Sequence, residues 1–211
     1  MTDKTVDDFT RALLDVDRLA AKQILQKRGH DTAPIKFAED VVLPALERIG
    51  TGWQEGTFAL SQVYMAGRIC EDLIDEILPP EDPDRKNQPR MAICILSDHH
   101  KLGKIMVYSF LRASGFDLSD YGVMEVDDLV EQVQKDNIDI LLISVLMLPS
   151  ALKIRTVKQK LDRLGCDVKL IAGGAPFRFD DQLWKTVGAD AMCRDASDAV
   201  SVIEKIMEGM A

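Results

Sequence analysis

Two adjacent histidines, His99 and His100, stand directly after the apolar run MAICIL of residues 91–96. Asp98 precedes the pair, and Gly103 follows it. A neutral imidazole is a good ligand for a transition metal, and a carboxylate two residues earlier can accept a hydrogen bond from the second ring nitrogen. One histidine cannot hold a free metal ion by itself. The D-x-H-x-x-G spacing therefore favours a metal already chelated in a macrocycle, with His100 as axial ligand and His99 as a bystander.

Two later segments also end in residues that could contact a ligand. Ser144 and Leu146 close the apolar run IDILLISVL, and Gly173 and Gly174 close VKLIAGG, where paired glycines permit close approach of the backbone. Each segment has an ordinary explanation as well, because serines and glycines are common where strands end. The chain contains no phosphate-loop or dinucleotide motif and no G-x-S-x-G nucleophile motif, so a nucleotide site or a catalytic triad has no motif support.

The second half of the chain must position these residues. Its short, almost unbroken apolar runs are typical of parallel strands that are buried on both faces. The expected strands are MAICILS, FDLSDYG, IDILLISVL, VKLIAGG and ADAMC, and the expected helices span 104–113, 126–135, 151–164, 181–187 and 196–207. This alternation predicts a flavodoxin-like (Rossmann-like) five-stranded parallel sheet in the order 2-1-3-4-5. The three polar or glycine-containing loops then meet at the carboxyl edge of the sheet.

The first half of the chain predicts helices only. Apolar residues at spacings of three and four predict one helix that ends near Gly29; they are Phe9, Leu13, Val16, Ala20 and Ile24. Thr32 with Pro34 is expected to begin a second helix, which Pro44 kinks or splits. Ser61 is expected to cap a third helix, whose inner face comprises Val63, Ala66, Ile69, Leu73 and Ile77.

The proline-rich segment 79–90 separates the two halves. It carries four prolines and many charges without an apolar period, which is typical of an exposed linker. The predicted α/β protein thus has an N-terminal helical bundle as a cap domain (1–78), a linker (79–90) and an α/β domain (91–211).

Composition narrows the function classes. The net charge of −9 and the lack of a basic stripe argue against nucleic acid as a partner. The four cysteines are far apart in the sequence, so we expect no zinc site or disulfide framework. We expect the cysteines to be buried free thiols instead. The start has no signal-peptide core, and no apolar stretch approaches the roughly 20 residues that cross a bilayer. We therefore expect a cytoplasmic protein without a membrane partner.

The motifs together resemble those of one family. Residues 98–103 resemble the D-x-H-x-x-G signature of cobalamin (vitamin B12)-binding domains, 144–146 their S-x-L element, and 173–174 their G-G element. The tail GADAMCRDASDAV (188–200) is similar to the end of the same domains. GTGWQEGTFALSQVYMAG (50–67) resembles the helical cap of corrinoid proteins of methyltransferase systems, such as methionine-synthase-like and methanol- or methylamine-type proteins. The resemblance covers residues 5–207.

The resemblance implies a base-off/His-on cobalamin or related corrinoid, with His100 as the lower cobalt ligand and Asp98 as its hydrogen-bond partner. The other implied contacts of the cofactor lie on the α/β domain: Gly103, Ser144, Leu146, Gly173 and Gly174. In the helical domain Trp53, Tyr64 and Met65 are implied to cap the upper face of the corrin, although ordinary packing in the bundle core remains an alternative for each.

The function implied is that of a non-catalytic carrier of a methyl group on cobalt. The implied partners are a donor-specific methyltransferase, an acceptor methyltransferase and a reductive activator of cobalt. A cobalamin-binding sensor module, a small subunit of an adenosylcobalamin-dependent mutase, and a flavodoxin-like domain without its ligand remain alternatives. The chain departs from the family pattern at Lys101 in place of an acid, Ile105 in place of asparagine, and Leu148 in place of threonine.

Overall fold

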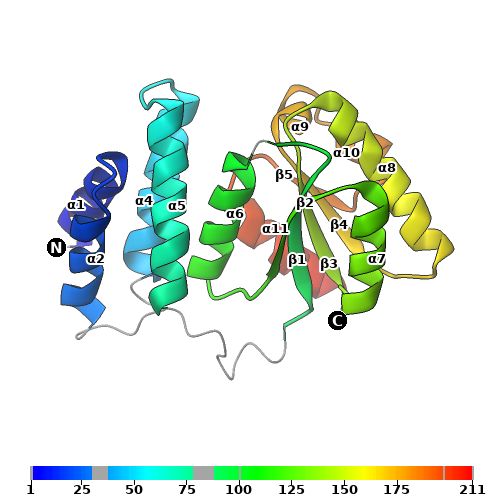
Figure 1. The fold of residues 1–211 in the computed structure, drawn as a ribbon, viewed down its shortest axis with the longest axis horizontal. Coiled ribbons are helices and arrows are strands. Elements are labelled where there is room, and N and C mark those ends of the chain that lie inside the picture. Colours follow the sequence, from blue (N-terminus) through cyan, green and yellow to red (C-terminus); the bar gives the residue numbers. More distant parts are fainter. Residues whose placement is uncertain (1, 30–37, 78–87, 100, 197, 211) are drawn as a thin grey trace. The chain divides into compact units, whose positions relative to one another are not determined.

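The computed structural model describes residues 2–29, 38–77, 88–99, 101–196 and 198–210, which form two compact units (Figure 1). One unit combines residues 1–86 with 105–116, and the other combines 87–104 with 117–211. Most of the predicted linker 79–90, as well as Thr32, Pro34 and His100, lies outside the described residues. No helix in the described ranges has the length and apolarity needed to cross a membrane.

The first unit is helical, as the sequence predicted. It contains α1 (Thr2–Leu14), α2 (Arg18–Gly29), the π-helix η1 (Ala38–Val42), α4 (Leu43–Gln54), α5 (Leu60–Ile77) and most of α6 (Leu102–Ala113). The predicted inner face of α5 is confirmed, because Val63, Ala66, Ile69 and Leu73 are all buried; the side chain of Ile77 is outside the described set.

The prediction of one continuous helix from Phe9 to Ile24 is wrong. Val16 adopts a left-handed conformation (φ 59°) and is exposed, and the chain turns between α1 and α2. The Val16 and Asp17 N–H groups donate to the carbonyls of Leu13 and Ala12, the Schellman arrangement that ends a helix. The Asp17 carboxylate then accepts from the Ala20 N–H and begins α2. The hydrogen bonds that cap the two helices therefore decide where the chain turns, although the apolar spacing alone would have continued the helix through Val16.

The two other helix starts of this unit are set by Pro44 and Gln62. Pro44 lies in the first turn of α4, directly after η1, so the predicted split at this proline is confirmed. Ser61 does not cap α5, which begins at Leu60; instead the Gln62 side chain reaches back to accept from the Ala59 N–H. The predicted cap at Ser61 lies two residues after the observed cap position, Ala59.

The second unit holds a five-stranded parallel sheet in the order β2-β1-β3-β4-β5, which confirms the predicted fold class (Figure 1). Its strands are β1 (Met91–Leu96), β2 (Ser119–Met124), β3 (Ile140–Ser144), β4 (Lys169–Gly173) and β5 (Ala191–Cys193). The helices after α6 are α7 (Val126–Asp136), α8 (Leu148–Arg163), α9 (Ala175–Phe179), α10 (Leu183–Thr186) and α11 (Asp198–Met210). The sequence did not predict the short helix α9.

Burial on both faces explains the unbroken apolar runs. All six residues of β1 are buried, and Ala92, Cys94 and Leu96 pack into one core with the inner sides of α7 and α8. The edge strand β2 is irregular, because its residues Tyr121 and Gly122 together lie opposite Cys94. Gly122 has φ 66°, which suits a residue without a side chain in such a bulge.

Candidate functional site

The Asp98 carboxylate fixes two loops at the carboxyl edge of the sheet. Asp98 follows β1 by two positions and is only 5% exposed. Its Oδ2 accepts from the backbone N–H groups of Leu146 (2.8 Å) and Met147 (3.0 Å), which follow β3, and its Oδ1 accepts from the His99 N–H at 2.7 Å. The Asp98 side chain thus joins the loop after β1 to the loop after β3 through hydrogen bonds from main-chain N–H groups.

Gly103 and Ser144 face each other across the same edge. A Cβ atom built on Gly103 would lie 3.3 Å from the Ser144 Oγ, so any side chain at position 103 would fill the space beside this hydroxyl. Ser144 is half-buried, and its hydroxyl has no hydrogen-bond partner within the described parts of the chain. A hydroxyl in this setting can bond to a polar group of a ligand.

Gly174 is required by the backbone of the neighbouring loop. Its φ is 124°, and a Cβ atom there would lie 1.7 Å from the carbonyl oxygen of Val145, while the Val145 N–H donates to the Gly173 carbonyl at 3.0 Å. Gly173 itself is less constrained, since its Cβ would lie 3.8 Å from the nearest atom, the Cys193 carbonyl oxygen. The loops after β3 and β4 therefore pack backbone against backbone.

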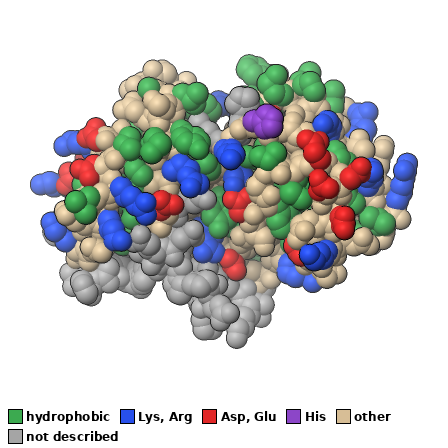
Figure 2. Space-filling model, in the orientation of Figure 1, with side chains coloured by type: hydrophobic (Ala, Val, Ile, Leu, Met, Phe, Trp, Pro, Cys, Tyr) green, Lys and Arg blue, Asp and Glu red, His purple; other side chains and the backbone are tan. Residues whose placement is uncertain are grey.

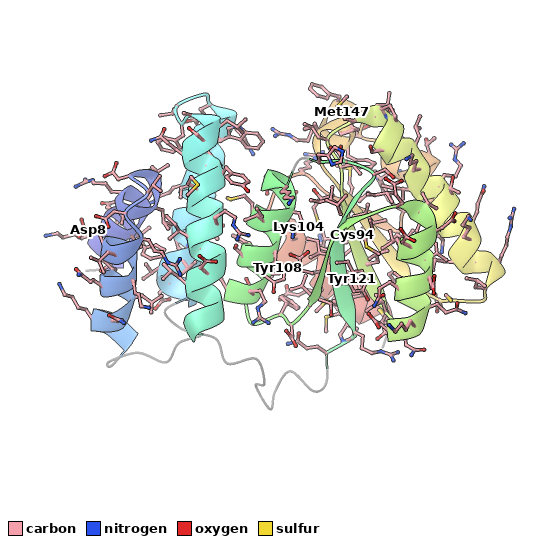
Figure 3. The ribbon with its side chains drawn as sticks, viewed as in Figure 1. Asp8, Cys94, Lys104, Tyr108, Tyr121 and Met147 are labelled. Carbon is pink, nitrogen blue, oxygen red and sulfur yellow. The ribbon has the colours of Figure 1, made fainter. Side chains whose placement is uncertain are left out.

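Exposed apolar side chains surround this edge. Met147 is 52% exposed, and Leu146, Leu148 and Leu152 are also exposed, while Phe179 of α9 is 90% exposed. Figure 2 shows hydrophobic side chains gathered at the upper end of the α/β unit, and Figure 3 places Met147 at that end, far from Cys94 in the middle of the sheet. An apolar edge of this kind suits a large, flat, apolar ligand surface.

Buried charges and thiols lie below the edge. The Lys104 ammonium pairs with the Asp120 carboxylate, and its side chain is almost fully buried. Burial raises the pKa of the Cys94 thiol, and burial likewise raises the pKa of Cys193 to about 12, so both remain neutral thiols at physiological pH. All four cysteines are free, and Cys70, Cys94 and Cys193 are buried as predicted.

The three predicted cap residues lie near the loop between α4 and α5. Trp53 is 42% exposed, and Tyr64 and Met65 are exposed to a similar degree, so none of them belongs to the helical core. Their alternative explanation as ordinary core residues is therefore excluded. Their predicted role over the corrin stays a prediction.

The described residues at this edge suit contacts to the periphery of a bound cofactor. Across the described residues, no group of three or more His, Cys, Asp or Glu side chains is placed to hold a metal ion. The edge instead offers an unpartnered hydroxyl, a glycine that leaves space beside it, and an apolar rim. Such a set suits a macrocyclic cofactor, for which a protein supplies an axial ligand and contacts to the periphery. His100, the predicted ligand, lies outside the described residues.

Two family matches cover most of the chain. Residues 90–204 match a family described as the B12 binding domain, and residues 5–78 match a second family with the same description. The chain belongs to the B12-binding domain family. The resemblance inferred from the sequence is thereby confirmed, and cobalamin or a related corrinoid is the cofactor class that the family supports.

Relatives and solved structures agree with this assignment. Monomethylamine corrinoid protein 1 of Methanosarcina mazei is 28% identical over 214 residues, with 96% of this chain and 97% of the relative covered. The structure of the Methanosarcina barkeri monomethylamine corrinoid protein matches with a TM-score of 0.67 at 23% identity, covering 98% and 100% of the two chains. The methanol:cobalamin methyltransferase complex of the same organism matches at TM-score 0.63 and 19% identity, covering 98% of this chain and 81% of that one.

The sequence did not predict two features of the site. The bonds from Asp98 to the Leu146 and Met147 N–H groups join residues 48 and 49 positions apart, and no periodicity signals them. One feature of the sequence could have predicted the helix α9. Pro176 stands directly after Gly174-Ala175, and a proline in the first turn is a common way to begin a helix.

Proposed function

We propose that this protein carries a methyl group on a bound corrinoid from a donor-specific methyltransferase to an acceptor methyltransferase. The observation that carries the proposal is that both B12-binding families occur on one chain, the helical one at 5–78 and the α/β one at 90–204. A carrier needs the α/β part to hold the cofactor and a helical part to cover its reactive face. The proposed domains are accordingly the cap (1–78), linker (79–90) and cofactor domain (91–211).

His100 is the proposed axial ligand of the cobalt, in the base-off/His-on state. Asp98 is suited to support it, since its carboxylate is held in place by three backbone N–H groups and carboxylate oxygens can accept more than one hydrogen bond. The remaining proposed contacts receive the displaced nucleotide tail; they are Gly103, Ser144, Leu146, Gly173 and Gly174. When bound, the corrinoid supplies a cobalt centre that can carry a methyl group.

Methyltransferases are the proposed partners, together with a reductive activator of cobalt. The relatives are named for methylamines, and one solved neighbour is a complex named for methanol:cobalamin methyltransferase. The proposed location is the cytoplasm. Trp53, Tyr64 and Met65 are proposed to cover the upper face of the corrin until a partner replaces them.

Reconstitution with hydroxocobalamin tests the proposal. The protein is loaded, freed of excess cofactor, and its absorption spectrum is compared with those of His100→Ala and the matched control His99→Ala. We expect one retained corrinoid in the wild type and in His99→Ala, and an altered axial ligand only in His100→Ala. A protein that retains no corrinoid would refute the carrier function, and identical spectra for all three proteins would refute His100 as the ligand.

Methyl transfer is then measured with the loaded protein and candidate donor systems for methanol or methylamines. We expect the corrinoid to become methylated with one of these donors and its methyl group to pass to an acceptor system. A light-driven change of the loaded protein, with no methylation by any donor, would instead favour a sensor.

A further inference from the structure

The residue before Asp98 has an unusual backbone conformation. Ser97 has φ 46°, and within the described ranges only Val16 and Asn137 are other non-glycine residues with positive φ. Val16 and Asn137 both lie at helix ends, where this conformation is common. Ser97 instead directly follows the inner strand β1, so its conformation must be maintained by its contacts.

Each polar group of Ser97 is bonded, and its partners lie in two other segments, Met124–Glu125 and the start of α8. Its N–H donates to the Met124 carbonyl at the end of β2 (2.9 Å), and its carbonyl accepts from the Ser150 hydroxyl in the first turn of α8 (2.7 Å). Its own hydroxyl donates to Glu125 Oε2 at 2.5 Å. Backbone bonds would be available to glycine as well, but the bond to Glu125 needs the serine side chain.

Glu125 is itself held in place. It is the residue before α7, and its Oε2 also accepts from the Lys153 ammonium of α8 at 3.3 Å. The hydrogen bond from Ser97 lowers the pKa of the Glu125 carboxyl, and the contact with Lys153 lowers it further, so Glu125 is ionised at neutral pH. A charged acceptor makes the bond from Ser97 stronger than one between neutral groups.

Two consecutive residues thus tie the end of β1 to both neighbouring loops. Ser97 is bonded to the segments after β2 and β3, and Asp98 is bonded to Leu146 and Met147 after β3. The peptide that leads to His99 and His100 therefore leaves the sheet in a direction that Ser97 sets.

We propose that Ser97, through its hydroxyl bond to Glu125, is a positioning residue that directs Asp98 and the axial histidine toward the cobalt of the corrinoid. This inference rests on the proposed function, because it requires His100 to be the ligand. Ser97 is not proposed to contact the cofactor itself. Its effect is on the ratio of histidine-bound to histidine-free cobalt.

Electron paramagnetic resonance of the cob(II)alamin-loaded protein, produced with ¹⁵N-labelled histidine, tests the histidine ligation and the positioning role of Ser97 separately. A ¹⁵N axial ligand splits the cobalt signal into doublets, whereas the ¹⁴N base of the cofactor itself splits it into triplets. Wild-type protein should give doublets. No bound corrinoid in the wild type would refute the proposed function, and triplets in the wild type would refute the proposed histidine ligation, whatever the variants show.

Ser97→Ala and Ser97→Gly then test the positioning role. Both remove the hydroxyl, but only glycine relieves the positive φ, so Ser97→Gly should fold at least as stably as Ser97→Ala. We expect both variants to lower the ratio of histidine-bound to histidine-free cobalt by about fivefold, the effect of losing one ordinary hydrogen bond, because the Glu125 carboxylate is exposed to solvent. Glu125→Ala should lower it similarly.

The matched control is Asp127→Ala, which removes a different ion pair between α7 and α8, that of Asp127 with Lys160. Asp127→Ala should keep the wild-type ratio, and urea unfolding of all variants reports their stability. A wild-type ratio in Ser97→Gly, with doublets retained in the wild type, would overturn the positioning role alone. An equal fall of the ratio in Asp127→Ala would also overturn it, since the effect would then be general loosening of these helices.

Discussion

The Asp98 carboxylate accepts a hydrogen bond from the Leu146 N–H at 2.8 Å, across 48 residues of sequence. This bond, with its neighbour to Met147, makes the carboxylate a structural part of the loop after β3. In its proposed role beside His100, Asp98 would link the position of that ligand to the loop after β3.

Asp98→Ala should therefore destabilise the protein even without cofactor. The backbone N–H groups of His99, Leu146 and Met147 lose their acceptor, which costs about 2–4 kcal/mol of unfolding free energy. Asp98→Asn keeps one oxygen acceptor and should cost about half as much. Urea denaturation of the cofactor-free proteins measures both, and an Asp98→Ala variant as stable as the wild type would contradict this role of the carboxylate.

Gly174→Ala should prevent normal folding, or cost at least about 3 kcal/mol, because its Cβ would overlap the Val145 carbonyl. Gly173→Ala is the matched control, since its Cβ finds ordinary space and should cost less than about 1 kcal/mol. Circular dichroism and urea denaturation compare the two. Equal effects would mean that the loop after β3 moves aside.

Gly67→Ala should weaken the helical unit by about 1–3 kcal/mol, the usual cost of an added methyl group in a packed core. A Cβ at position 67 of α5 would lie 2.9 Å from Cγ2 of Ile105 on α6. The double variant with Ile105→Ala should cost less than the sum of the two single variants, because the added methyl group then fills the space that is vacated. Additive costs would show that the two residues do not share this contact.

The Arg90–Asp139 pair should stabilise the starts of β1 and β3 in a pH-dependent way. The Arg90 side chain and N–H bond to the Asp139 carboxylate and lower its pKa below the ordinary value of about 3.9. The stabilisation is thus complete above about pH 4 and is lost as the pH falls through the lower, folded-state pKa.

Asp139→Asn should accordingly lower the Tm at pH 7 by about 3 °C, a small shift because Arg90 is exposed to solvent. The difference in Tm between the variant and the wild type should shrink as the pH falls below about 4. A constant difference from pH 7 to pH 2 would show that the charge of Asp139 does not contribute.

Trp53→Ala should cost the cofactor-free protein less unfolding free energy than a core substitution does, about 1 kcal/mol, since Trp53 is 42% exposed. Ile49→Ala on the same helix α4, where the side chain is fully buried, should cost about 2–5 kcal/mol. If Trp53 caps the corrin, its variant should change the rate at which small ligands exchange at the upper face of cobalt. An unchanged rate would remove Trp53 from the cap.

The sequence predicted the fold well where burial alone decides it. Strands that are covered on both faces leave unbroken apolar runs, so β1, β3 and β4 followed from the pattern. The weaker strands β2 and β5 followed only from the alternation of strands and helices, and the strand order followed from the fold class. The break at Val16 was missed because a Schellman turn depends on backbone hydrogen bonds and not on the apolar period. The start of α5 was also predicted wrongly, because several polar residues near Leu60 could have capped the helix. Only the hydrogen bond from the Ala59 N–H to the Gln62 side chain shows which residue does so.

The sequence predicted the individual residues of the candidate site, but it did not predict the hydrogen bonds that join them. Asp98, Ser144 and Gly174 were identified from spacing, and topology brought their loops together. The bonds of the Asp98 carboxylate to Leu146 and Met147, and of the Ser97 hydroxyl to Glu125, join residues far apart in sequence. Such bonds depend on the register of neighbouring strands, which composition does not specify.

The two edges of the sheet have a consequence for self-association. An exposed, regular edge strand can pair with a strand of another molecule and seed aggregates. Here β5 is only three residues long, and the bulge at Tyr121 and Gly122 interrupts β2, where Asp120 is paired with Lys104. Neither edge offers a long, flat row of free backbone groups, so the sheet is protected against edge-to-edge polymerisation.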